Sequence, residues 1–86
     1  MTTPDTVDLV DIDHGGAEFP YRQLARFLRE RIVSGEYPAG RKLPSLVALQ
    51  AESGLSAKTC QRAIAVLAAE GLVVTVPNRG TFVTNR

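Results

Sequence analysis

The sequence has no tryptophan, one cysteine, one histidine and only five aromatic side chains among its 86 residues. A single cysteine cannot form a disulfide within the chain, and Cys60 and His14 together supply too few ligands for a structural zinc site. Catalysis by Cys60 would require a nearby base, and the only histidine lies far away in a polar segment, so we interpret Cys60 as a buried structural thiol. Because no set of acid, base, nucleophile or metal ligands converges, the sequence predicts neither an enzyme nor a cofactor.

Long apolar runs and a signal peptide are also absent. A membrane-spanning helix needs roughly 20 apolar residues, and a signal peptide needs a basic flank where this N-terminus carries acids. A chain of this length buries about 60 to 65% of the surface that its unfolded form exposes, which leaves room for one small core. The sequence therefore predicts a single soluble domain in the cytoplasm with no membrane partner.

Charges of both signs are present, but they are divided unevenly along the chain. Residues 1–21 carry five carboxylates and no lysine or arginine, whereas residues 22–86 carry ten basic side chains and four glutamates. The net charge of +1 therefore conceals −5 on the first part and +6 on the second. A basic surplus suits a polyanionic partner, because each phosphate contact releases counterions, although a solubilising surface explains the charge equally well.

The acidic N-terminal arm, residues 1–19, is predicted to be disordered because it contains few large apolar side chains to offset its ordering entropy. A weak apolar alternation at Val7, Leu9, Val10 and Ile12 is also compatible with a short strand in this arm. Two roles for the arm remain open. It can fold back onto the basic surface and compete there with phosphates, or it can be a solvated tail without function.

Residues 20–86 predict an α+β, mainly α, domain with three helices and a C-terminal hairpin. The first helix covers about 20–34, has Pro20 in its first turn and is ended by Gly35. A type I turn at 37–40 and an extended stretch near Leu43, which allows a short strand, lead to a second helix at about 46–53. The apolar faces of these helices are Tyr21, Leu24, Leu28 and Ile32, then Leu46 and Leu49.

The third helix is predicted to begin at Ala57, after a Ser56 cap, and to reach about residue 70. Its buried stripe consists of Cys60, Ala63, Ile64 and Leu67. Strands at 72–76 and 81–84 flank a turn at 77–80, and this arrangement places Arg79 near the tip of a hairpin.

Two helices joined by a glycine-containing turn and followed by a hairpin form a winged helix-turn-helix pattern. Lys58, Thr59 and Gln61 can reach base edges from a helix in the major groove, and the capped helix start offers N–H groups to phosphate. Arg79 on its tight loop can enter a narrow minor groove. Each side chain alone also fits a solvated charge or a plain cap, and only their joint occurrence favours DNA binding.

These residues resemble the winged-helix DNA-binding domain of the GntR transcriptional regulators. The resemblance rests on the motifs Leu43-Pro44-Ser45, Glu70-Gly71-Leu72-Val73 and Arg79-Gly80-Thr81-Phe82-Val83. It implies a bacterial, nucleoid-associated transcription factor, with repression favoured, that binds as a homodimer to a palindromic operator in double-stranded DNA. The DNA-binding residues that we expect are Ser45, Ser56, Ala57, Lys58, Thr59, Gln61, Arg62, Arg79, Gly80 and Thr81.

The sequence departs from the family at Val47, Ala57 and Gln61, where arginine is common, and Lys58 and Arg62 replace those charges only in part. Arginine reads guanine in a bidentate manner whereas glutamine suits adenine, so we expect an unusual operator or weaker binding.

Family members usually carry a C-terminal domain that binds an effector and dimerises. This sequence ends directly after the wing, so we expect no small-molecule effector site within it, and either a minimal regulator or an isolated domain fits. The alternative function is a protein-interaction module on the same scaffold that binds an acidic partner, because a scaffold does not fix a function.

Overall fold

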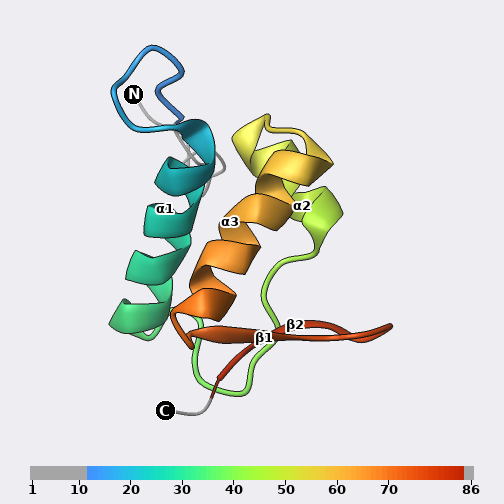
Figure 1. Ribbon diagram of the computed structural model, residues 1–86. Coiled ribbons are helices and arrows are strands. Elements are labelled where there is room, and N and C mark those ends of the chain that lie inside the picture. The colour runs from blue at the N-terminus through green and yellow to red at the C-terminus, as the bar shows by residue number, and fades with distance from the viewer. Residues whose placement is uncertain (1–11, 85–86) are drawn as a thin grey trace, which may run out of the picture.

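The computed structural model describes residues 12–84 and shows, within them, three helices followed by a two-stranded antiparallel sheet (Figure 1). The elements in chain order are α1 (Pro20–Ser34), α2 (Leu46–Ser53), α3 (Ala57–Ala69), β1 (Val73–Val76) and β2 (Gly80–Val83). The predicted winged helix-turn-helix architecture is confirmed, and the strand ends differ by at most one residue from those expected from the sequence.

The helix boundaries follow from local chemistry. The side-chain oxygen of Ser45 accepts a hydrogen bond from the Ala48 amide at 3.1 Å, and that of Ser56 accepts one from the Thr59 amide at 3.2 Å. Both serines therefore satisfy a backbone donor that has no partner inside the helix. At the C-terminal end of α1, Gly35 has a φ of +91°, a left-handed conformation that glycine adopts without strain.

The core lies where α1, α2 and α3 meet and is closed by the sheet. Its fully buried large side chains are Leu24, Leu28, Leu49, Cys60 and Leu67. The cysteine is therefore a buried thiol, as predicted, and its sulfur lies 3.7 Å from the hydroxyl of Ser53. Four residues expected in the core are only partly buried and lie at its edge: Tyr21, Ile32, Leu46 and Ile64.

The connector between α1 and α2 runs along the hairpin. The amide of Leu43 donates to the Thr81 carbonyl at 2.8 Å, and Lys42 forms an isolated antiparallel bridge with Phe82. The short strand expected near Leu43 is thus a single bridge. The predicted type I turn at 37–40 is wrong, because the hydrogen-bonded turn starts one residue later, at Pro38, and Gly40 in its third position has a φ of +82°, which is typical of type II.

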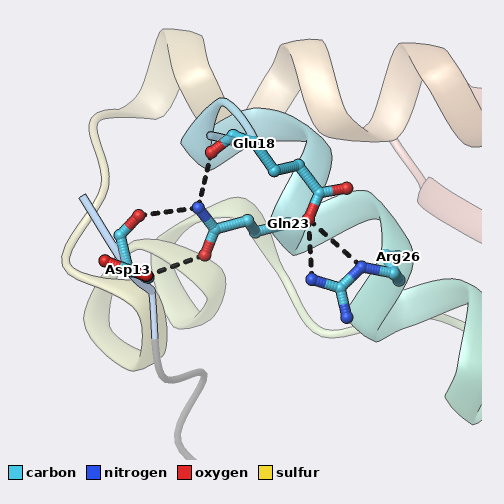
Figure 2. Close-up of polar contacts among 4 residues, drawn as sticks. All are labelled: Asp13, Glu18, Gln23 and Arg26. Carbon is cyan, nitrogen blue, oxygen red and sulfur yellow. Dashed lines mark hydrogen bonds and ion pairs between the residues drawn. The ribbon is translucent and has the colours of Figure 1, made fainter. Parts of the chain in front are cut away.

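The segment before α1 is tied to that helix by Gln23, whose side chain lies between Asp13 and Glu18 (Figure 2). Its amide nitrogen donates to the carbonyl oxygens of Asp13 and Glu18, both at 2.7 Å, and its oxygen accepts from the Asp13 amide at 2.8 Å. Residues 12–19 therefore differ from the disorder expected of them, since the buried Gln23 side chain binds their backbone and Ile12 packs, half-buried, against the core. The first eleven residues of the predicted arm, including Val7, Leu9 and Val10, lie outside the described residues.

Candidate nucleic-acid interface

The start of α3 brings together five of the predicted site residues. Ser56, Lys58, Thr59, Gln61 and Arg62 line one open groove on the first two turns of the helix. The opposite side of α3 carries its buried residues and packs against α1 and α2. The helix thus exposes a polar face formed by side chains that donate and accept hydrogen bonds.

The Ser56 cap leaves part of the helix start available to a ligand. Its hydroxyl accepts from the Thr59 amide and donates to the Thr59 side-chain oxygen at 3.0 Å, so both side chains are held in place. The amides of Ala57 and Lys58 precede the first internal hydrogen bond of the helix and point out of its end. Such amides, together with the helix dipole, favour an anion such as a phosphate.

The ion pairs found within residues 12–84 involve only arginines of α1. Arg26 pairs with Glu18 and Arg29 pairs with Glu70, each with an N–O distance of 2.6 Å, and Arg31 pairs with Glu36. The hydrogen bonds from Arg29 and Arg26 hold the pKa values of Glu70 and Glu18, respectively, below the usual carboxyl range. Within residues 12–84, the basic side chains that make no ion pair are Arg22, Arg41, Lys42, Lys58, Arg62 and Arg79. Uncompensated positive charge is therefore found at the start of α1, on α3, on the connector and on the wing.

The wing is the hairpin of β1 and β2, which extends to one side of the helices in Figure 1. Its tip is a turn in which the Arg79 amide donates to the Val76 carbonyl at 3.0 Å, and the Arg79 side chain is exposed. Gly80 has a φ of +124°, and a Cβ atom there would lie 2.5 Å from the Cε atom of Lys42. The lysine side chain of the connector thus lies directly against the wing, a contact that the sequence did not reveal.

The other predicted site residues have structural roles. Ser45 directly precedes α2, and its side-chain oxygen forms the N-cap of that helix. Thr81 is half-buried, its hydroxyl lies 3.2 Å from that of Thr75 across the hairpin, and it lines a groove with Gln61 between α3 and the sheet. The structure therefore joins the wing to the α3 face through Thr81, whereas Ser45 contributes from a separate helix.

Tyr21 is a contact of the site that sequence reasoning missed, because it was assigned to the core. Its ring lies under the guanidinium of Arg62, with a distance of 4.1 Å from Cζ to the ring centroid. Arg22 approaches the same ring at 5.4 Å, and the ring of Phe19 stacks near it at 6.3 Å. No local pattern connects positions 21 and 62, so only the packing of α1 against α3 could reveal this cluster.

No helix within residues 12–84 is long and apolar enough to cross a membrane, and no cluster of three or more histidine, cysteine, aspartate or glutamate side chains there could hold a metal ion.

Comparison with known families and proteins agrees with this geometry. The profile of the family described as "Bacterial regulatory proteins, gntR family" matches residues 20–83. The chain is 42% identical over 66 residues to the uncharacterized HTH-type transcriptional regulator YjiR of Escherichia coli strain K12, which covers 77% of this chain and 14% of that protein. It is 38% identical over 63 residues to the mannosyl-D-glycerate transport/metabolism system repressor MngR of the same organism, covering 73% of the chain and 26% of MngR. The chain thus spans between one seventh and about one quarter of the length of these relatives.

Solved structures of DNA-binding regulators have a similar fold. YtrA from Sulfolobus acidocaldarius, a GntR-family transcription factor, superposes with a TM-score of 0.82 at 32% identity, covering 92% of this chain and 83% of YtrA. The DNA-binding domain of AraR in complex with operator ORX1 superposes with a TM-score of 0.79 at 27% identity, covering 88% of this chain and 98% of that domain.

Proposed function

Because the chain belongs to the GntR family of bacterial regulatory proteins, we propose that it binds double-stranded operator DNA sequence-specifically and serves as the DNA-binding part of a transcriptional regulator. The observation that carries this proposal is the placement of uncompensated charge. The arginines that are paired with carboxylates all lie on α1, whereas Lys58, Arg62 and Arg79 make no ion pair with any described residue. The similar AraR domain, whose structure contains an operator, supports the same reading.

In the proposed binding mode, α3 enters the major groove with its N-terminal turns. Lys58, Gln61 and Arg62 are exposed there and present donors, and in glutamine also an acceptor, to base edges. The amides at the start of α3 face a phosphate. Arg79 at the wing tip enters the minor groove, where a narrow groove concentrates negative potential.

We infer that the regulator represses transcription and binds as a homodimer to a palindromic operator in the cytoplasm, at the nucleoid. Repression is supported by two relatives whose names state it, MngR and the histidine utilization repressor of Pseudomonas putida. Two-fold symmetry would place two copies of α3 in successive major grooves about one helical turn apart.

The departures from the family pattern predict an altered operator. Val47 is 74% exposed on α2, and the exposed Gln61 lies on the reading face of α3, so arginine is missing at positions open to a partner. Glutamine suits adenine where arginine suits guanine. Gln61→Arg is expected to shift the preferred sequence toward guanine, and an unchanged preference would contradict this assignment.

The test is selection of bound duplexes from a random library at low and at moderate salt, followed by affinity measurements on the selected sequence. Arg62→Ala is expected to weaken binding to the selected sequence about tenfold or more and to relax the preference at the base position that Arg62 contacts. Arg26→Ala is the matched control, because it removes the same charge from an exposed side chain that is paired with Glu18. Equal and small losses in both variants would overturn the proposed interface.

A second candidate is a protein-interaction module, which the exposed Val47 favours because a large apolar side chain stands on the helix before α3. In that case no duplex binds even at low salt, and Val47→Glu weakens capture of an acidic protein partner, because it removes the apolar contact and adds a repelling charge.

A further inference from the structure

We propose that Tyr21 is a positioning residue that orients the Arg62 guanidinium for DNA, an inference that rests on the proposed function. Tyr21 is the second residue of α1 and Arg62 the sixth of α3, so the contact joins two helices that are packed against each other. The Cζ atom of Arg62 lies 4.1 Å from the centroid of the tyrosine ring, which is within the range of a close cation–π contact.

The position of Tyr21 follows from the helix period. Tyr21, Leu24 and Leu28 share one face of α1, and the two leucines are fully buried against the core. Tyr21 lies at the end of that face and is only half-buried, because there the core gives way to solvent. The ring therefore has one part anchored by the helix and another part available to a neighbour on α3.

Stacking on a ring leaves the hydrogen-bonding capacity of arginine intact. A guanidinium carries its five N–H donors in its own plane, whereas the ring contacts its face. A phosphate or a guanine can therefore approach the edge of Arg62 while Tyr21 fixes the orientation of that edge. Arg62 makes no ion pair with any described carboxylate, so the ring is the only charge-specific contact found for it in residues 12–84.

Two neighbours complete this arrangement. The ring of Phe19 lies 6.3 Å from that of Tyr21 at an interplanar angle of 13°, and Arg22 lies 5.4 Å from the Tyr21 centroid. Phe19 is 66% exposed, a large apolar surface next to the proposed interface. Phe19 and Arg22 therefore both border the ring that Arg62 contacts.

Positioning lowers the conformational entropy that Arg62 loses when it binds. An arginine side chain has many rotamers, and fixing them before binding improves affinity without adding a contact. Tyr21→Leu, which keeps apolar bulk but removes the π face, is therefore expected to weaken binding to the selected duplex roughly three- to tenfold. Tyr21→Phe keeps the face and is expected to stay within about twofold of the wild type.

A double-mutant cycle separates positioning from a direct contact. In an Arg62→Ala background, Tyr21→Leu is expected to cause no further loss, because the residue through which it acts is gone. Additive losses would overturn the proposal, and so would an equal loss in Tyr21→Phe, which would indicate that the hydroxyl touches DNA. Thermal unfolding of each variant shows whether a lost core contact explains the change, since a structural role would lower the midpoint without coupling to Arg62.

A measurement on the free protein keeps this inference separate from the proposed function. Stacking predicts upfield ring-current shifts of the Arg62 side-chain protons in the NMR spectrum of the wild type and of Tyr21→Phe, and their loss in Tyr21→Leu. Unshifted protons in the wild type would refute the positioning role even if DNA binds. Shifted protons together with absent duplex binding would instead refute the proposed function and leave the Tyr21–Arg62 contact standing.

Discussion

Replacing Gln23 by leucine tests whether one buried side chain holds the segment before α1. Gln23 is only 8% exposed and makes three hydrogen bonds to the backbone of Asp13 and Glu18, at 2.7 to 2.8 Å. At about 1 kcal/mol for each bond, their loss would cost about 3 kcal/mol if the backbone groups stayed buried and unpaired. The segment can instead detach, so that its groups bind water and regain conformational freedom. We therefore expect Gln23→Leu to lower the free energy of unfolding by about 1 to 2 kcal/mol.

The assay combines urea unfolding with hydrogen exchange of residues 13–18. Detachment predicts that the amide of Asp13 loses protection and that a protease specific for acidic residues cuts after Glu18 faster than in the wild type. Gln61→Leu is the matched control, because it makes the same change at an exposed glutamine of α3 and should leave exchange at residues 13–18 unaltered. Full protection of the Asp13 amide in Gln23→Leu would refute the reasoning.

Three further changes test other parts of the structure. Gly80→Ala introduces a Cβ atom at a φ of +124° and 2.5 Å from Lys42 Cε, so we expect a loss of about 1 to 3 kcal/mol in thermal unfolding and weaker duplex binding, and full stability would contradict the wing geometry. Ser56→Ala removes the α3 cap and should cost about 1 kcal/mol in urea unfolding, whereas Ser56→Asp should retain most of it. Glu70→Gln removes the exposed ion pair with Arg29 and should cost only about 0.5 kcal/mol at neutral pH. Since Arg29 lowers the pKa of Glu70, the difference in unfolding free energy between the wild type and Glu70→Gln should be fully present above pH 4.5, the ordinary carboxyl pKa, and should disappear as the pH falls through the lowered pKa. A stability difference that persists in acid would point to packing instead.

The features that could be predicted from the sequence are those coded by neighbours in the chain. Ser56 followed by a helix and Gly35 after a helix are local signals, because the chemistry that they satisfy lies within one turn. Local signals are less decisive where two registers suit the same residues. Pro38 and Gly40 fit a type I turn that starts at Tyr37 as well as a type II turn that starts at Pro38. The two turns are distinguished by the hydrogen bond from the Arg41 amide to the Pro38 carbonyl and by the positive φ of Gly40.

The contacts that could not be predicted join residues far apart in the chain. Tyr21 follows the apolar period of α1 and was expected in the core, yet its place at the end of the helix brings it to Arg62 instead. Gln23 carries no apolar signal, so the order that it gives to residues 12–19 does not show in composition. On the candidate interface, the exposed residues of α3 were predictable from helical period, whereas the contact of Lys42 with the wing depends on how the connector is paired with β2.

The pairing of the connector with β2 has a consequence for how the protein and an operator adapt to each other. An isolated two-stranded hairpin is marginally stable in water, but here Leu43 donates to Thr81 and Val83 donates to Arg41, and Ser45 at the start of α2 follows only two residues after Leu43. Backbone hydrogen bonds therefore tie the hairpin to the segment that leads into α2, and the span between the wing and the helices is set on folding. In the proposed binding mode, a DNA site whose groove spacing does not match that span must itself bend or change its groove width. Sequence-dependent stiffness of base pairs that the protein never touches then becomes part of operator choice.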